Sequence, residues 1–191
     1  MNKSRLEAFS DGVIAIVITI MVLEFKVPHG TQWPDLLPLW PVFLSYVLSF
    51  VNVGIYWNNH HHLLHATKQV NARILWANMN LLFWLSLMPF TTAWMGENHF
   101  AGIPVAFYAL DLTLCGIGYI VLQAQIIQSQ GADSLLRQAV GGDLKGKISM
   151  GSYVASIPLA LFGLPGLAGV LLAAVALIWF IPDQRIEKTL V

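Results

Sequence analysis

The sequence predicts an all-α integral membrane protein with six membrane-spanning helices. Of its 191 residues, 57% are hydrophobic and only 10% are charged, and the mean hydropathy is +0.66. A soluble domain would carry about 25% charged residues, so a chain this apolar belongs in a lipid bilayer. The single cysteine, Cys115, excludes an intrachain disulfide. A net charge of zero offers no basic surface, so nucleic acid is not an expected partner.

Six apolar windows locate the expected helices, because a helix needs about 20 mainly apolar residues to cross the hydrocarbon core. They form one six-helix domain over residues 1–191 and cover about residues 4–25, 39–64, 72–95, 103–127, 147–163 and 166–182. We expect Pro89 to kink the third helix. A Gly-Leu-Pro-Gly turn at residues 163–166 joins the last two helices.

Basic residues are distributed unevenly between the two ends of these helices. With six spans, one side of the membrane holds only Lys26. The other side holds nine of the ten lysines and arginines, which are Lys3, Arg5, Lys68, Arg73, Arg137, Lys145, Lys147, Arg185 and Lys188. Because Lys and Arg are enriched in cytoplasmic loops, both termini are expected in the cytoplasm.

The first helix combines a polar start with a regular apolar face. Asp11 enters a strongly apolar segment, where a charged group costs roughly 2.5–3.5 kcal/mol at the helix centre and therefore usually faces protein or water. A mainly apolar face follows, which we call the seam. Its residues are three or four positions apart, a spacing typical of helices that pack against partner helices. Asp11 lies off the seam, so we expect it to face other helices of its own subunit. Ile20 lies at the edge of the seam, which consists of Phe9, Gly12, Ile16, Thr19 and Leu23.

The start of this helix resembles the signature of the transmembrane protein 175 family, which comprises endolysosomal potassium channels and six-helix prokaryotic relatives. The matching residues are Arg5, Phe9-Ser10-Asp11-Gly12, Ala15-Ile16-Val17-Ile18-Thr19 and Val22-Leu23-Glu24. Further likeness lies in Tyr56-Trp57-x-x-His60-His61 and in Asn80-Leu81-Leu82-Phe83 followed by Pro89-Phe90-x-Thr92. The resemblance covers about residues 5–95.

The resemblance implies a potassium-permeable channel, not an enzyme, assembled as a homotetramer in which four copies of the first helix surround a central pore. It implies an apolar side-chain filter at Ile16, with Thr19, Ile20 and Leu23 as further pore residues. Potassium, and with it rubidium and caesium, would pass near Ile16 and Thr19 without tight binding, and no cofactor or bound metal is expected. The chain also lacks the Thr-Val-Gly-Tyr-Gly segment of carbonyl filters. The implied location is the inner membrane of a prokaryotic cell.

A set of polar residues around the first helix is predicted to be structural. A buried charge needs partners, and removing one partner is expected to cost about 3–5 kcal/mol. The set would hold the first helix in register against the second and third, and it comprises Arg5, Phe9, Ser10, Asp11, Trp57, His61 and Asn80.

Two alternatives to a channel remain open. A proton-coupled or substrate transporter would use Asp11, Asp111 and the histidines of the second helix as relays, although no inverted repeat is visible. The other alternative is a purely structural membrane protein. A metal site at His61 and His65 is disfavoured, because no cysteine or close carboxylate completes a zinc set. Asp111 has three possible roles, a solvated vestibule residue, a packing partner or a cation attractor, and we favour the first two.

Overall fold

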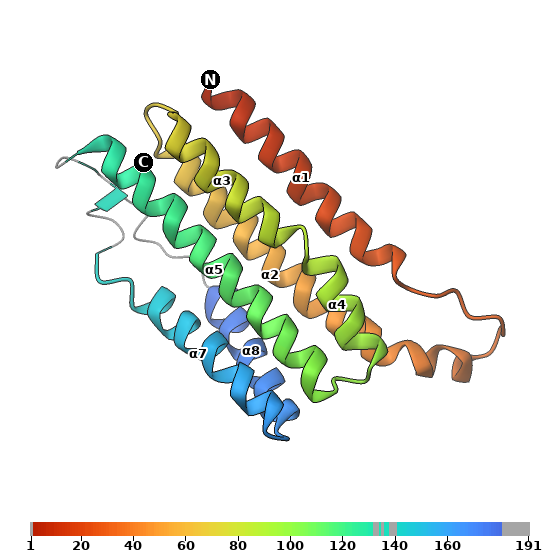
Figure 1. The fold of residues 1–191 in the computed structure, drawn as a ribbon. Coiled ribbons are helices and arrows are strands. Elements are labelled where there is room, and N and C mark those ends of the chain that lie inside the picture. Colours follow the sequence, from red (N-terminus) through yellow and green to blue (C-terminus); the bar gives the residue numbers. More distant parts are fainter. Residues whose placement is uncertain (1, 132–133, 135, 138–140, 181–191) are drawn as a thin grey trace.

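The computed structural model describes residues 2–131, 134, 136–137 and 141–180. Its helices lie side by side in an elongated bundle, and successive spans run in opposite directions (Figure 1). They are α1 (Lys3–Leu23), the 3-10 helix η1 (Trp33–Leu39), α2 (Trp40–His65), α3 (Ala72–Leu85), α4 (Met88–Glu97), α5 (Gly102–Gln130), α7 (Leu144–Leu161) and α8 (Pro165–Phe180). Counting α3 and α4 as one span, this is the all-helical, six-helix architecture that the sequence predicts.

The helix starts follow from local side-chain chemistry. Asn71 precedes α3, and its side-chain oxygen accepts a hydrogen bond of 3.0 Å from the Ile74 backbone nitrogen. Asp143 does the same for α7, where it accepts from the Gly146 nitrogen at 3.0 Å. Such caps satisfy backbone donors that have no partner inside the helix.

The third span differs from the expected kinked helix of residues 72–95, because it is broken into α3 and α4. α3 ends at Leu85, and α4 begins at Met88 with Pro89 in its first turn. A proline ring clashes with the carbonyl four residues earlier, which here belongs to Leu85. Proline is tolerated in the first turn of a new helix, so the chain stops and restarts instead of bending.

Four segments are long and apolar enough to cross a membrane, by length and composition, and they are Lys3–Leu23, Trp33–His65, Ala72–Glu97 and Gly102–Gln130. The last two helices are shorter, with 18 residues in α7 and 16 in α8. At 1.5 Å per residue, α8 reaches about 24 Å, somewhat less than a hydrocarbon core of about 30 Å. Residues 181–182 of the predicted sixth span lie outside the described residues.

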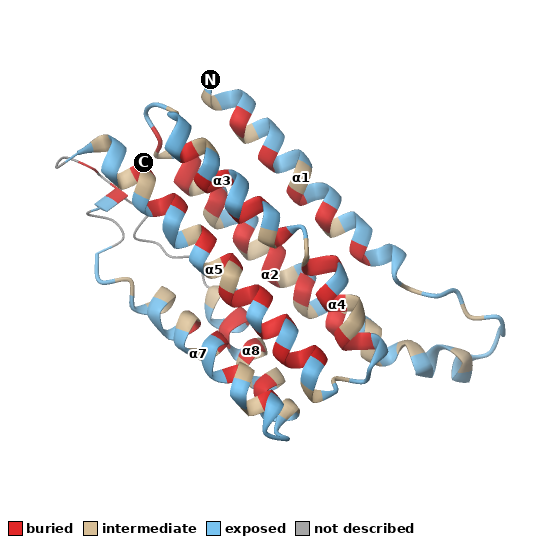
Figure 2. Cartoon of the chain, viewed as in Figure 1, coloured by how far each residue is buried: buried red, intermediate tan, exposed pale blue. Residues whose placement is uncertain are grey.

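The buried core lies between the central helices, whereas α1 occupies one edge of the bundle and α7 and α8 the opposite edge (Figures 1 and 2). α5 contributes buried residues along its whole length, from Pro104 to Ile126. Much of the outer surface is apolar, as expected for helices surrounded by lipid.

Candidate functional site

The rest of the subunit covers only one of the two faces of α1. The covered face packs against α2, α3 and α4 and consists of Leu6, Ser10, Ile14, Val17 and Met21. The opposite face carries the seam, in which Phe9 is 49% exposed, Ile16 57% and Leu23 76%. Gly12 and Thr19 are exposed as well, and Figure 2 shows this uncovered side of α1. The seam therefore points away from its own subunit.

Thr19 is the one side chain of the seam that can form hydrogen bonds. Its hydroxyl donates a hydrogen bond of 3.0 Å to the Ile16 carbonyl oxygen, one turn earlier in α1. A hydroxyl has one donor and two acceptor lone pairs. Because the proton is engaged by the helix backbone, the Thr19 oxygen presents acceptor capacity on an otherwise apolar face.

A groove of about 440 Å³ runs between α1 and the start of α4, directly beside the seam. From α1 its walls include Ile16 and Ile20, and from α4 they include Pro89 and Phe90. Phe90 is 59% exposed and Ile20 41% exposed. Ile16 thus borders both the seam and the groove, whereas Ile20 belongs to the groove side.

Asp11 and Trp57 form a polar contact at the surface of the subunit, off the seam. The Trp57 indole Nε1 donates a hydrogen bond of 2.9 Å to the Asp11 Oδ1 atom. Both residues are exposed in the single subunit, Trp57 by 45%. This bond ties α1 to α2 outside the buried core, and it joins two members of the predicted structural set.

A second polar contact of α1 is fully buried. The Asn78 Nδ2 atom donates to the Ser10 hydroxyl oxygen at 3.0 Å, and the Ser10 hydroxyl donates to the Leu6 carbonyl at 2.9 Å. The Asn78 Oδ1 atom lies 2.7 Å from the Nε2 atom of His60. Because an amide oxygen only accepts, the Nε2 atom of His60 must carry the proton. The Ser10–Asn78–His60 chain links α1, α3 and α2.

Several members of the predicted polar set are not brought together. His61 and Asn80 are exposed, and their expected places are taken by His60 and Asn78. Phe9 lies on the exposed seam. Arg5 is exposed as well, and within the described part of the chain its side chain has neither a hydrogen bond nor an ion pair.

The phase of the buried stripes could have identified the two correct residues. On α2 the buried positions advance by three or four residues from Ser49 through Asn52 and Tyr56 to His60. His61 lies off this stripe. Its ring instead stacks on the ring of His65, with centroids 6.3 Å apart and an interplanar angle of 10°. Among the described residues, no three His, Cys, Asp or Glu side chains converge as a metal-binding group would.

Asp111 is a packing partner and not a solvated vestibule residue, because its side chain is only 3% exposed. The Thr91 hydroxyl donates to its Oδ2 atom at 3.0 Å and joins α4 to α5. The Cys115 thiol lies 4.0 Å from its other oxygen.

A neighbouring buried group was not anticipated from the sequence. The Thr92 hydroxyl donates to the Ser49 hydroxyl oxygen at 2.6 Å, and Ser49 donates to the Tyr108 hydroxyl at 3.0 Å. The Asn52 Nδ2 atom also reaches the Tyr108 hydroxyl, at 3.4 Å. Together these side chains connect α4, α2 and α5 inside the subunit.

At the opposite end of α1 from the N-terminus, an ion pair joins Lys26, which lies outside the spans, to the last residue of α4. The Lys26 ammonium is 2.6 Å from a carboxylate oxygen of Glu97. The hydrogen bond and the charge of Glu97 raise the pKa of Lys26 above its usual value. The pair links the segment after α1 to the end of α4.

Known proteins resemble this chain both in sequence and in fold. The family described as endosomal/lysosomal potassium channel TMEM175 matches residues 5–89. A potassium channel of Chryseobacterium sp. (strain P1-3) is 54% identical over 190 residues, which cover 100% of this chain and 98% of that relative. The human endosomal/lysosomal proton channel TMEM175 is 38% identical over 96 residues, or 44% of this chain and 19% of the human protein.

A solved structure agrees with these matches. The crystal structure of a lysosomal potassium-selective channel TMEM175 homolog from Chamaesiphon minutus matches with a TM-score of 0.79 and 26% identity, covering 95% of this chain and 97% of that one. The resemblance noted in the sequence is thereby confirmed. Because the Chryseobacterium channel shares 54% identity along nearly its whole length, this chain belongs to the TMEM175 family of membrane channels.

Proposed function

We propose that the chain forms a homotetrameric, potassium-permeable cation channel whose pore is lined by the seam of α1 from four copies. The observation that carries this proposal is the contrast between the two faces of α1, one buried in the subunit and the other uncovered. One helix supplies only part of a pore wall. Several copies must therefore contribute their seams, as expected for a family member with six helices per chain.

Ile16 is the residue that we assign to the narrowest ring of this pore. Its side chain is 57% exposed, and a β-branched side chain is stiff about χ1, so four copies can hold a small apolar aperture. A hydrophobic constriction stops ions when water leaves it and lets them pass when water fills it. Sodium holds its hydration shell more tightly than potassium does, so such a ring favours potassium, rubidium and caesium.

Thr19 and Leu23 continue the pore beyond this ring. The Thr19 oxygen, whose proton is engaged by Ile16, can accept contacts from a cation or from its hydration water. Leu23 is 76% exposed at the end of α1 and adds a second apolar ring.

The groove between α1 and α4 is the surface that we assign to the neighbouring subunit. It lies beside the seam, and Ile16 belongs to both. In this arrangement Ile20 contacts the next subunit more than the ions, so it affects selectivity less than Ile16 does.

We propose that the N-terminal end of α1 faces the cytoplasm, in the inner membrane of a prokaryotic cell. The Lys3 ammonium donates to the His65 carbonyl oxygen at 2.7 Å, which places the start of α1 beside the end of α2. The connection between α2 and α3, which contains Lys68 and is followed at once by Arg73, lies at the same end of the bundle (Figure 1). Arg185 and Lys188 lie outside the described residues.

A proton-coupled transporter is less well supported. Asp11 is bonded to Trp57, whereas Asp111 is bonded to Thr91 in a separate group. Across the described residues, no chain of hydrogen bonds connects Asp111 to Asp11 or to the histidines of α2. A relay through both carboxylates therefore lacks its connecting side chains.

Flux through the purified protein in liposomes tests the proposal. We expect passive potassium flux down its gradient, without an imposed proton gradient, from a species that mass photometry identifies as a tetramer. Flux that requires a proton gradient would instead indicate a proton-coupled transporter. A monodisperse monomer or dimer that still conducts would overturn the four-copy pore.

A further inference from the structure

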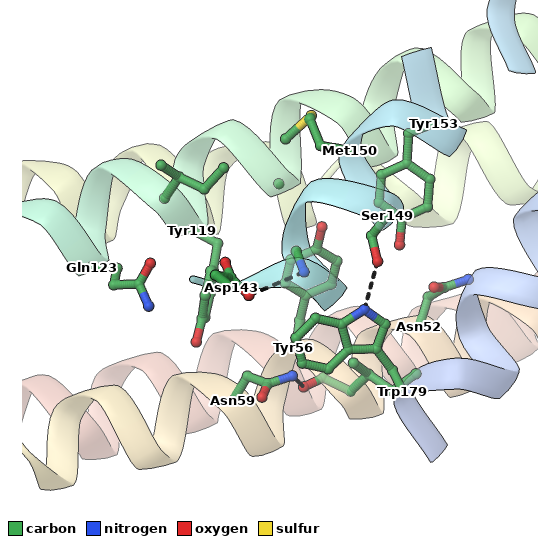
Figure 3. Close-up of a pocket in the computed structure, with 14 residues that line it drawn as sticks. Asn52, Tyr56, Asn59, Tyr119, Gln123, Asp143, Ser149, Met150, Tyr153 and Trp179 are labelled. Atoms are coloured by element: carbon green, nitrogen blue, oxygen red, sulfur yellow. Dashed lines mark hydrogen bonds between the residues drawn. The ribbon is translucent and has the colours of Figure 1, made fainter. Parts of the chain in front are cut away.

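A separate cavity lies inside the subunit, between α2, α5, α7 and α8 and away from the seam (Figure 3). Its volume is about 80 Å³, and its polar lining includes Asn52 and Asn59 from α2, Gln123 from α5 and Tyr153 from α7. Figure 3 shows these side chains spread along the cavity, with Gln123 at one end, Tyr153 and Asn52 at the other and Trp179 of α8 forming part of the wall. None of these residues belongs to the proposed pore.

Two of the polar side chains have no hydrogen-bond partner among the described residues. Gln123 is 9% exposed and Tyr153 is 6% exposed, yet no described residue is hydrogen-bonded to the Gln123 amide or the Tyr153 hydroxyl. Within the described chain, no completely enclosed side-chain nitrogen or oxygen is left without a partner. Both groups must therefore open into the cavity. Buried amides and hydroxyls lose free energy unless something bonds them.

The two asparagines add acceptors to the same space. The Asn52 and Asn59 amide nitrogens donate to backbone carbonyls of α2, those of Leu48 at 3.0 Å and Ile55 at 2.9 Å. Their side-chain oxygens are therefore the atoms left for the cavity. With the hydroxyl of Tyr153 and the amide of Gln123, the cavity presents both donors and acceptors, so its ligand must offer both.

The charged side chains nearest the cavity have contacts within the protein. The Asp143 carboxylate accepts from the Gly146 nitrogen at the start of α7. The Lys145 ammonium lies 5.6 Å from the centroid of the Trp179 ring. Asp143 is thus the one charged group among the described lining residues, and it is engaged with the start of α7.

The volume decides between an organic ligand and water. An apolar cavity that holds benzene measures about 150 Å³, roughly twice this one, and one water occupies about 30 Å³ in the liquid. We propose that the cavity is a binding site for a cluster of about two or three water molecules, held by Gln123, Tyr153, Asn52 and Asn59. Buried water requires two to four polar partners, and the waters bond one another as well as these side chains.

The water cluster joins the outer helices to those that hold α1. Asn52 also donates to the Tyr108 hydroxyl, and from there hydrogen bonds continue through Ser49 to Thr92 on α4. The waters thus complete a polar chain from α7 to α4, which packs against α1. This inference is independent of the ion that the pore conducts.

X-ray hydroxyl-radical footprinting of the intact protein in lipid nanodiscs tests the site, because radicals formed from bound water oxidise the side chains beside it. We expect Tyr153 to be oxidised several-fold faster than Tyr108. Tyr108 is the internal control, since it is a fully buried tyrosine that does not line the cavity. Equal, slow oxidation of the two tyrosines would show a dry cavity and overturn the proposal.

A variant whose new side chain fills the cavity tests whether the water is bound there. A Cβ atom at Gly116 would lie 2.8 Å from the Met150 methyl and 3.7 Å from the Tyr56 hydroxyl, so Gly116→Val places its side chain in the cavity. Oxidation of Tyr153 should fall to the level of Tyr108. Gly151→Val is the matched control, because nothing lies within 4 Å of a Cβ there, and it should leave oxidation unchanged. Persistent oxidation in a folded Gly116→Val protein would place the water elsewhere.

If Gly116→Val does not fold, a high-resolution cryo-EM map of the unaltered protein decides the question. Discrete water density inside the cavity, beside the Tyr153 hydroxyl or the Gln123 amide, supports the site. An empty cavity, or continuous density of a lipid or detergent, overturns it.

Discussion

α1 and α5 are both long apolar helices, but they are held in the subunit in different ways. Only 28% of the apolar window of α1 is buried, against 56% for α5. α5 is surrounded by α3, α4, α7 and α8, whereas α1 lies at the edge of the bundle (Figure 1). α5 is therefore the structural centre of a subunit, and α1 is the helix whose free face is completed by other copies.

This difference separates two classes of substitution. Changes at the buried side of α1 or inside the α4–α5 contact should alter the stability of the subunit. Changes on the seam should instead alter conduction and leave the subunit folded.

The largest effect is expected at Asn78, which links α1, α2 and α3. Asn78→Ala leaves the buried Nε2 proton of His60 without an acceptor, at a cost of about 1–3 kcal/mol, and it also removes the bond to Ser10. Thermal unfolding of the purified protein should show a clear decrease in midpoint. Asn80→Ala, two residues later on the exposed side of α3, is the control and should melt like the unaltered protein. Equal losses in both variants would contradict the assigned network.

Asp111 provides the next test, on the α5 side of the comparison. Asp111→Leu removes the acceptor of the Thr91 hydroxyl, and interhelical hydrogen bonds in membranes contribute about 1–2 kcal/mol at most. Asp111→Asn keeps an oxygen in place, so we expect a melting midpoint and potassium flux close to those of the unaltered protein. Loss of flux in a stable Asp111→Asn protein would make Asp111 a relay and favour the transporter alternative.

A smaller effect is expected at Asp11, because its bond to Trp57 lies at an exposed edge. Asp11→Ala should weaken the attachment of α1 by about 0.6 kcal/mol, the average for such bonds, and lower the yield of tetramer more than it changes the permeability ratio. Trp57→Phe removes the same donor while keeping an aromatic ring and should reproduce the effect. A normal tetramer yield with a changed potassium-to-sodium ratio would instead place Asp11 in the ion path.

The sequence predicted the helices well because charge-free windows are a strong signal in a membrane protein. The break between α3 and α4 was expected only as a kink. A proline ends a helix, and does not merely bend it, where the chain can start a new helix with the proline in its first turn. That choice depends on the packing of the new helix, here around the buried residues Met88 and Thr91.

The candidate site was predicted less completely, for a physical reason. The seam follows from the spacing of residues within a single helix, so the sequence of that helix is enough to identify it. Its role in the pore remains a prediction. The network depends on the rotational phase of α2 and α3, and a shift of one or two residues separates His60 and Asn78 from His61 and Asn80. The cavity depends on Gln123 and Tyr153, which come from two different helices, α5 and α7, and no pattern within either helix indicates that both line one cavity.

Reversal potentials of Ile16→Ala and Ile20→Ala channels under opposed potassium and sodium gradients test the central claim most directly. Both variants remove the same atoms from exposed apolar positions of α1, but only Ile16 belongs to the seam. We predict that Ile16→Ala widens the apolar ring, raises sodium conductance and lowers the potassium-to-sodium permeability ratio, with a much smaller change for Ile20→Ala. An unchanged ratio in Ile16→Ala would contradict the account and move the filter to Thr19 or Leu23.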